Sequence, residues 1–353
     1  MCKKSGGFVR TTVVITAALS LLAATGTAAG CADKQSSKAA PTRPVAAVTT
    51  VADVPLTPES AAAAFTRWVA NDDVARAAGD ERLGMAWADD GQVQVTASEY
   101  RRARLAKKSV TRYTYGKPTL YVPHEKSYPR WFVAEVARND QKTLMAFTKR
   151  AQGARFKLSM AVTVAKGMKV PPVTVAADGY ATALVPRDQS LVIQPTLVAS
   201  LQAAIAEEGT KSYSTKVMRS GPYTTGYFDR AQKAAKKAGK DGLIYDAGFN
   251  GTALPVFPLR TEDGGALVLY GLSRDVSTTI KIPGKGRLVL PPEASHLMAA
   301  PLTGNELEVY ENLQFAAVVP VAESKDPKKP KPKNPPKASV IAEGGGVIRA
   351  KTI

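Results

Sequence analysis

The stretch WFVAEVARNDQKTLMAFTKR, residues 131–150, holds two apolar runs, each of which ends in arginine, at Arg138 and Arg150. The runs are rich in aromatic and β-branched residues, which fit the half-buried surface of a sheet. A short Asn-Asp turn separates them, and such turns are typical of tight hairpins. Similar runs occupy residues 110–122 and 156–164. The sequence therefore predicts an antiparallel meander of four strands.

A second stretch, ALPVFPLRTEDGGALVLYGLSR at residues 253–274, has the same layout, because apolar runs ending in Arg260 and Arg274 flank a short acidic turn. Two unrelated hairpins would also look alike, since acidic turns are common. The shared layout favours a duplication. Strands of the second half are predicted at residues 242–249, 254–260, 266–274, 277–282, 307–321 and 338–353.

Helices precede the strands in each half. Thr57 is placed to cap a first helix, Pro58 suits its first position, and Phe65 and Trp68 share one face. Further helices are predicted at residues 73–88, 97–107, 194–209 and 224–239. The repeated order favours two tandem α+β units, at residues 57–168 and 178–353, with a linker at 169–177.

Helices packed on one face of a curved antiparallel sheet resemble the cystatin-like or nuclear-transport-factor-like fold. The chain has 353 residues, of which 44% are hydrophobic and 22% charged, so it has room for two cores. The expected fold class is α+β, with two tandem units of this kind.

The first 30 residues have the three parts of an export signal. These are a positive head with Lys3, Lys4 and Arg10, an apolar run at 13–24 and small residues at 26–30. A helix that crosses a bilayer needs about 20 strongly apolar residues, and this run is shorter. Cys31 follows, and the sequence is then polar and punctuated by proline to about residue 56, which predicts a flexible tether.

The residues Ala28-Ala29-Gly30-Cys31 resemble the lipobox of bacterial lipoproteins. The resemblance implies cleavage between Gly30 and Cys31, diacylglycerol on the Cys31 sulfur, and an acyl chain such as palmitate on the new amino group. The lipobox usually has leucine where this chain has Ala28. The alternatives are ordinary cleavage that leaves a free thiol, and an uncut membrane anchor.

The cysteine count agrees with lipidation. The other cysteine, Cys2, would leave with the signal, so Cys31 would have no partner for an intramolecular disulfide. The layout as a whole resembles uncharacterised actinobacterial lipoproteins that carry a domain of unknown function. That resemblance implies a lipid-anchored protein on the extracytoplasmic face of the cell membrane, and it implies no known reaction.

The chain is strongly basic, with a net charge of +18 that becomes +15 without the three basic residues of the signal. Such a charge favours anionic lipid or wall polymer as partner, and no nucleic acid is expected outside the membrane. Two basic clusters suit helix faces, at residues 101–112 and 230–240. A third lies in a Lys/Pro-rich loop at 322–337 between two strands, and its lysines are predicted to bind an anionic surface, with simple solvation as the alternative. These lysines are Lys325, Lys328, Lys329, Lys331, Lys333 and Lys337.

Signatures of catalysis and metal binding are missing from the sequence, including G-x-S-x-G, S-x-x-K, a Walker loop and zinc-ligand spacings. We therefore expect no catalytic residue, no metal and no cofactor, and a non-catalytic binding or scaffolding role. His124, beside Glu125, could serve as a base or be an ordinary surface histidine. The acidic pairs Asp72-Asp73, Asp89-Asp90 and Glu262-Asp263 suit helix caps and turns.

The alternative function is a small-ligand carrier or an enzyme that uses the concave pocket of a nuclear-transport-factor-like unit. Aromatic residues of the predicted strands could line such a pocket or could pack in the core. They are Tyr113, Tyr115, Tyr121, Trp131 and Phe147.

Overall fold

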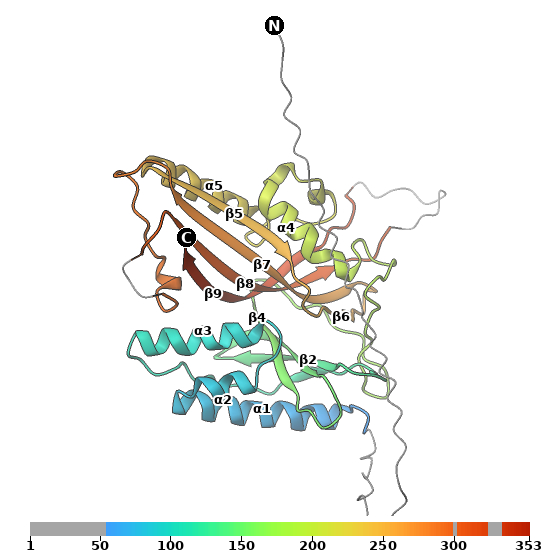
Figure 1. Cartoon of the computed structure of the whole chain (residues 1–353). Helices are drawn as coiled ribbons and strands as arrows, with labels where there is room; N and C mark the ends of the chain where they lie inside the picture. Colours follow the sequence, from blue (N-terminus) through green and yellow to red (C-terminus); the bar gives the residue numbers. More distant parts are fainter. Residues whose placement is uncertain (1–53, 299–301, 324–333) are drawn as a thin grey trace, which may run out of the picture. The chain divides into compact units, whose positions relative to one another are not determined.

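The computed structural model describes residues 54–298, 302–323 and 334–353 (Figure 1). These residues belong to one unit, which starts at Ala52. The predicted signal at 1–30, Cys31 and most of the tether lie outside the described residues, as do five lysines of the Lys/Pro-rich loop.

Three helices open the described chain, as the sequence predicts. The Thr57 side chain accepts from the Ser60 backbone N–H at 3.2 Å, and the Ser60 hydroxyl in turn accepts from the Thr57 N–H at 2.9 Å. Gly79 ends the first helix in the left-handed region, with φ of 65°, so the helix predicted at 73–88 is divided in two. The helices are α1 (Pro58–Ala78), α2 (Glu81–Ala86) and α3 (Gln92–Leu105).

The predicted four-stranded meander is confirmed. Asn139 and Asp140 have φ of 47° and 62°, which is the left-handed pair that a two-residue hairpin turn needs. Of the run 110–122 only the last part forms a strand, because proline and glycine interrupt the rest. The strands are β1 (Thr119–Tyr121), β2 (Arg130–Arg138), β3 (Gln141–Lys149) and β4 (Lys157–Val164), all antiparallel.

The second half also begins with helices. Its two α-helices are α4 (Val198–Glu208) and α5 (Thr225–Lys240), and its 3-10 turns are η1 (Pro195–Leu197), η2 (Gly209–Lys211), η3 (Tyr213–Lys216) and η4 (Pro292–Ala294). Its strands are β5 (Leu243–Gly251), β6 (Phe257–Arg260), β7 (Ala266–Ile280), β8 (Glu306–Val319) and β9 (Ser339–Thr352).

Two strands predicted at 266–274 and 277–282 are one strand in the structure, β7. Asp275 and Val276, at the predicted break, pair with Tyr310 and Val309 of β8. Pairing with β8 on one side and β5 on the other keeps the polar segment extended.

All nine strands form one antiparallel sheet, in the order β1-β2-β3-β4-β9-β8-β7-β5, with β6 also paired to β7. The two halves join where Thr163 and Val164 of β4 pair with Glu343 and Ala342 of β9. The C-terminal strand thereby satisfies the backbone groups at the free edge of the meander. The structure thus shows the predicted fold class at a coarser level, as an α+β protein with helices packed on one large sheet. The division into two tandem units stays a prediction.

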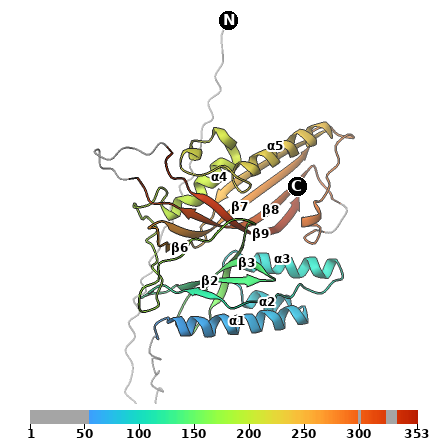
Figure 2. The same ribbon diagram turned by 180° about the vertical axis from the view of Figure 1, so that it is seen from behind.

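The sheet folds back so that its two halves face each other, and a helical layer covers each outer face (Figures 1 and 2). Trp131 of β2 packs against Phe257 of β6 between the two halves, with ring centroids 5.4 Å apart. Phe65 and Trp68 of α1 pack on Phe147 at the outer face of the meander. The described unit therefore has helices on both outsides, with α1 and α2 on one and α4 and α5 on the other, while α3 lies between α2 and β9 (Figure 1).

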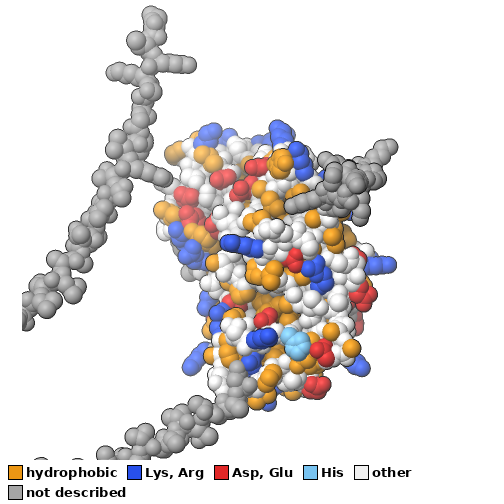
Figure 3. Space-filling model, turned by 90° about the vertical axis from the view of Figure 1, so that its right-hand side faces the viewer, with side chains coloured by type: hydrophobic (Ala, Val, Ile, Leu, Met, Phe, Trp, Pro, Cys, Tyr) orange, Lys and Arg blue, Asp and Glu red, His pale blue; other side chains and the backbone are white. Residues whose placement is uncertain are grey.

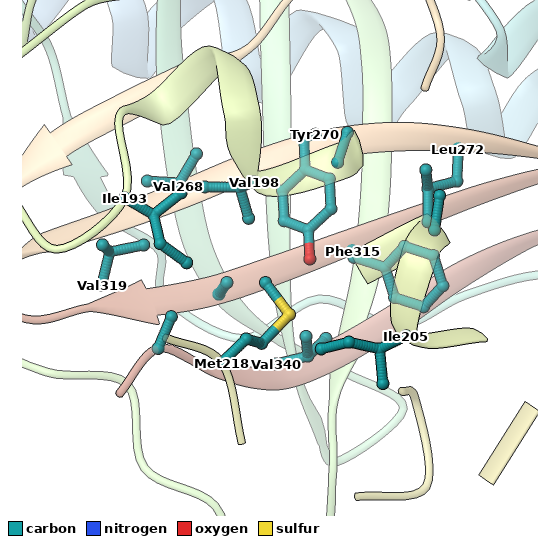
Figure 4. Close-up of a cluster of buried hydrophobic side chains, with 14 of the residues drawn as sticks. Ile193, Val198, Ile205, Met218, Val268, Tyr270, Leu272, Phe315, Val319 and Val340 are labelled. Carbon is teal, nitrogen blue, oxygen red and sulfur yellow. The ribbon is translucent and has the colours of Figure 1, made fainter. Parts of the chain in front are cut away.

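The core under α4 and α5 is shown in Figure 4. Tyr270 and Phe315 are fully buried there, with ring centroids 5.9 Å apart, and Ile205 and Met218 pack around them. Each such apolar side chain stabilises the fold by about 1.5–3 kcal/mol. Tyr270 donates its hydroxyl hydrogen to the side-chain oxygen of Gln202, which fixes α4 on the sheet.

Candidate anion-binding surfaces

Helix α5 presents a row of five positive side chains to solvent. Their spacing of three and four residues places them on one face of the helix. The ion pairs found among the described residues include none of them. These side chains belong to Arg230, Lys233, Lys236, Lys237 and Lys240, and all are exposed.

The opposite face of α5 is fixed to the sheet by Tyr227. Its ring packs against Phe249 at 5.1 Å, and its hydroxyl donates to the carboxylate of Glu343. Burial raises the pKa of Tyr227, and Glu343 raises it further, so the phenol stays protonated and keeps donating. The row of cations is therefore carried by a firmly seated helix.

The cluster at 101–112 is also basic, but several of its cations form ion pairs. Arg101 and Arg104 both bind Glu81, at 2.8 and 3.2 Å, and Arg112 forms two 2.7 Å hydrogen bonds with Asp73. These two carboxylates pair with three of the six cations of the cluster. The α3 cluster is thus a network of surface ion pairs, whereas the α5 row keeps its full positive charge.

Of the predicted surface-binding lysines, the structure describes Lys337. Its ammonium donates to the carbonyl oxygen of Thr215 at 2.7 Å, so it anchors the start of β9. The remaining five, Lys325, Lys328, Lys329, Lys331 and Lys333, lie outside the described residues, and their binding role stays a prediction. The strands on either side of the loop pair antiparallel, as predicted.

A cationic cavity of about 300 Å³ lies beside Val54, where the described chain begins. Arg67, Arg130, Lys149 and Arg155 line it, together with apolar side chains that include Trp87 and Phe156. The Arg130 guanidinium donates to the Val54 carbonyl oxygen. Sequence reasoning missed this cavity, because its cations come from α1, β2, β3 and a loop.

Figure 3 shows one side face of the molecule, on which Lys and Arg side chains lie over both the upper and the lower part, beside scattered acidic ones. Positive charge is thus spread over the surface, and pairing with acids is what distinguishes one cluster from another.

His124 does not pair with Glu125. Its Nε2 lies 3.0 Å from the Asp178 carboxylate, and its ring stacks on Tyr180 with centroids 3.5 Å apart. Burial raises the pKa of Glu125, which lies apart from this contact. The His124 side chain is 63% exposed, as expected for the surface alternative.

Ser98 and His296 form a serine–histidine contact that the sequence could not show, since 198 residues separate them. The Ser98 Oγ lies 2.6 Å from the Val347 carbonyl oxygen and 2.5 Å from His296 Nε2. A carbonyl only accepts, so the serine donates its hydrogen to Val347 and accepts one from the histidine. In this arrangement His296 cannot act as a base toward Ser98, and the pair ties α3 to β9.

The acidic pair Asp89-Asp90 binds a single arginine. Arg150 lies 2.7 Å from Asp89 and also contacts Asp90, while Ser159 donates to Asp90. Burial raises the pKa of Asp90. Burial also acts to raise the pKa of Asp89, but hydrogen bonds from Arg150 and other groups outweigh it and lower the pKa of Asp89 overall. Their oxygens are committed to these partners, and the pair forms a structural turn before α3.

The other two acidic pairs divide between a turn and an ion pair. Asp263 accepts from the Gly265 N–H at 3.1 Å, which confirms a turn role. Asp72 lies inside α1 and binds the buried Arg76 at 2.8 Å, so the predicted cap or turn role is wrong for it. Arg76 also binds Glu99 at 2.9 Å and lies 4.4 Å from the Tyr113 ring, which cross-links α1 and α3.

The aromatic residues proposed for a concave pocket pack against other side chains. Phe147 is stacked on Phe132 at 4.9 Å, and the Tyr121 hydroxyl donates to Glu135 at 2.9 Å. Tyr115 contacts Phe65 and Trp68, Tyr113 contacts Arg76, and Trp131 contacts Phe257. The part of the sheet that the structure describes is therefore filled by its own aromatics.

The chain belongs to the family described as a domain of unknown function, DUF8094, whose model matches residues 54–352. It is 28% identical over 151 residues to an uncharacterized lipoprotein of Streptomyces avermitilis, which covers 42% of this chain and 44% of the relative. An uncharacterized lipoprotein of Streptomyces coelicolor is 28% identical over 153 residues, with the same coverage. The matches thus span less than half of these relatives. No solved structure matches the chain.

No helix among the described residues is both long and apolar enough to cross a bilayer. No group of three or more His, Cys, Asp or Glu side chains in the described ranges is arranged to hold a metal ion.

Proposed function

We propose that this protein is a lipoprotein anchored through Cys31 to the extracytoplasmic face of the cell membrane, and that it binds an anionic polymer of the cell wall without catalysis. Anchoring is supported by the lipobox-like sequence Ala28 to Cys31 and by two relatives that are named lipoproteins. The observation that carries the binding proposal is the α5 row of exposed cations, which take part in none of the ion pairs among the described residues.

The shape of the row fits a polymer. From Arg230 to Lys240 it extends about 15 Å along the helix, at 1.5 Å per residue. Such a length contacts several charges of a chain molecule at once. Each exposed contact is weak and screened by salt, so binding would depend on the number of charges along the polymer.

The α5 row is accessible to a polymer, because α5 lies in an outer layer of the described unit and the side chains of the row are exposed (Figure 1). Poly(glycerol phosphate), a polyanion with regularly spaced phosphodiesters, is a suitable probe.

The binding test compares variants of the full chain. Lys233→Gln with Lys236→Gln removes two charges from the row, and Lys166→Gln with Lys169→Gln removes two exposed charges elsewhere. We expect the first variant to bind poly(glycerol phosphate) at least about tenfold more weakly at low salt, and the second to bind like the wild type. Equal losses in both variants would show that net charge, and not the α5 row, binds the polymer.

Anchoring is tested separately with Cys31→Ala. The wild type should incorporate labelled palmitate and sediment with membranes, and the variant should do neither. If the wild type takes up no label, the lipoprotein proposal fails.

The finer fold proposal is that the two halves arose by duplication of one cystatin-like or nuclear-transport-factor-like unit. Its support is the repeated order of helices followed by antiparallel strands in α1–β4 and in α4–β9. Solving the structure of a relative in which one half occurs alone would test this origin.

A further inference from the structure

We infer that a cavity beside the C-terminal half of α3, the α3 cavity, binds a small zwitterion, either a free amino acid or a short peptide with small side chains. The α3 cavity has a volume of about 410 Å³, and its lining residues belong to α1, to α3 and to the segment 106–113. The site is separate from the α5 row and does not depend on the proposed wall binding.

Two residues of α3 bring opposite charges to the cavity without pairing to each other. Glu99 and Arg102 both line it, and a spacing of three residues is one at which an ion pair can form on a helix. Glu99 instead binds Arg76 of α1 at 2.9 Å, and its side chain is still 32% exposed. Arg102 is exposed and takes part in none of the ion pairs among the described residues. A carboxylate and a guanidinium are thus both open to the same cavity.

The turn after α3 adds a second cation, Lys108. Lys107 has φ of 52°, in the left-handed region, and the Lys108 N–H donates to the Ala103 carbonyl oxygen at 2.9 Å, which together form a common helix end. The Thr111 carbonyl oxygen then accepts from Arg76 at 3.0 Å, which ties the returning segment to α1. Lys108 lines the cavity, is exposed, and forms none of the ion pairs in the part of the chain that the structure describes. Its backbone is therefore fixed while its ammonium group can receive an anion.

Arg76 and Tyr113 form the buried part of the lining. Arg76 is 5% exposed and binds Asp72 at 2.8 Å in addition to Glu99, so its own charge is already balanced. The Tyr113 ring lies 4.4 Å from the guanidinium of Arg76 and 4.5 Å from that of Arg138. Burial raises the pKa of Tyr113, and Glu99 raises it further, so the phenol keeps its hydrogen and can donate it to a ligand.

These groups together define a ligand with two charges. An ammonium group of the ligand would gain Glu99 as its partner, and a carboxylate would gain Arg102 and Lys108. An anion alone would also meet Glu99, and a cation alone would also meet the two positive side chains, so a molecule that carries both charges fits the cavity best. The volume of about 410 Å³ is large enough for a dipeptide. The apolar lining consists of small side chains, those of Ala103, Ala106 and Val110.

The test measures binding of L-alanine and of L-alanyl-L-alanine to the full chain by calorimetry. N-acetyl-L-alanine lacks the ammonium group and L-alanine amide lacks the carboxylate, so these two serve as control ligands. The wild type should bind at least one zwitterion, and each control ligand at least about tenfold more weakly. Binding of alanine supports a free amino acid, and binding of the dipeptide alone supports a short peptide. The proposal is overturned if neither zwitterion binds at millimolar concentration, or if a control ligand binds as tightly as the zwitterion.

Arg102→Gln with Lys108→Gln, the cavity variant, removes both cations that would hold the carboxylate. Both side chains are exposed, so the fold should tolerate the change. This variant should bind the zwitterion at least about tenfold more weakly than the wild type, since two charge-assisted contacts are lost. Lys166→Gln with Lys169→Gln, the control of equal charge, should change the affinity by less than about twofold. Equal losses in the two variants would refute the site, because net charge alone would then explain the binding.

Thermal unfolding provides a second readout that guards against a misfolded variant. The zwitterion should raise the unfolding temperature of the wild type by mass action and leave that of the cavity variant unchanged. A cavity variant that gains as much as the wild type would contradict the proposal. Lys233→Gln with Lys236→Gln, the α5 variant, should bind the zwitterion like the wild type, so failure of the wall-binding proposal leaves this result readable.

Discussion

Tyr227 of α5 donates its hydroxyl hydrogen to the carboxylate of Glu343, a residue of the strand that joins the two halves of the sheet. One hydrogen bond thus links the basic helix to the junction between β4 and β9. The ring of Tyr227 is buried, and Arg230 lies 4.3 Å above it.

Tyr227→Phe should destabilise the protein by about 1–3 kcal/mol, because it leaves the charged Glu343 oxygen without its donor. Urea unfolding followed by circular dichroism measures the change. Tyr213→Phe is the matched control, since the Tyr213 side chain is 75% exposed and should tolerate loss of its hydroxyl. Equal stability of the two variants would show that the Glu343 contact contributes nothing.

The charges of α5 should not contribute to stability. Lys233 lies three or four residues from Arg230, Lys236 and Lys237, and like charges at these spacings repel. Lys233→Gln with Lys236→Gln should therefore leave the unfolding temperature unchanged or raise it slightly, while polymer binding falls. A clearly lowered temperature would indicate that these lysines serve the fold, and the binding proposal would lose its support.

Local signals made the meander predictable. The Asn139-Asp140 turn and the apolar runs beside it are contiguous in sequence, so one short stretch determines the β2–β3 hairpin. The pairing of Thr163 with Glu343 joins residues far apart in the sequence, and no local pattern specifies it. Since β9 completes the meander's edge, this single pairing turns two predicted units into one sheet.

The candidate surfaces were predictable only as clusters. The spacing of the α5 lysines placed them on one helix face, which the structure confirms. Whether a cluster is neutralised depends on acids from other elements, such as Glu81 for Arg101 and Asp73 for Arg112. The cavity beside Val54 gave no sequence signal, because it assembles cations from separate strands and helices.

Gly91 is required because of close packing. A Cβ built there would lie 1.9 Å from Nδ2 of Asn312, which is buried. Gly91→Ala should therefore destabilise the protein by about 1–3 kcal/mol. Gly239→Ala in α5 is the control, because nothing lies within 4 Å of its Cβ position and alanine favours a helix by about 0.5–1 kcal/mol. Denaturant unfolding should show changes of opposite sign, and changes of the same sign would contradict the contact.

The Ser98–His296 contact should make stability depend on pH in a defined direction. Burial lowers the pKa of His296, and Arg102 and Arg101 lower it further, so the folded protein favours the neutral ring. The unfolded chain takes up the proton near pH 6.5. The neutral His296 ring therefore makes its full contribution to the free energy of unfolding above about pH 6.5. This contribution is lost as the pH falls through the lower pKa of the folded state.

His296→Gln tests this direction, because the glutamine amide can still donate to Ser98 but does not titrate. Between pH 7.5 and 5.5 the wild type should lose more unfolding free energy than the variant, and the difference between the two slopes isolates His296 from the other titrating groups. Ser98→Ala should in addition cost about 1–3 kcal/mol at pH 7.5, since the Val347 carbonyl loses its donor. If wild type and His296→Gln lose stability in parallel, folding does not lower the pKa of His296, and the predicted pH dependence is wrong.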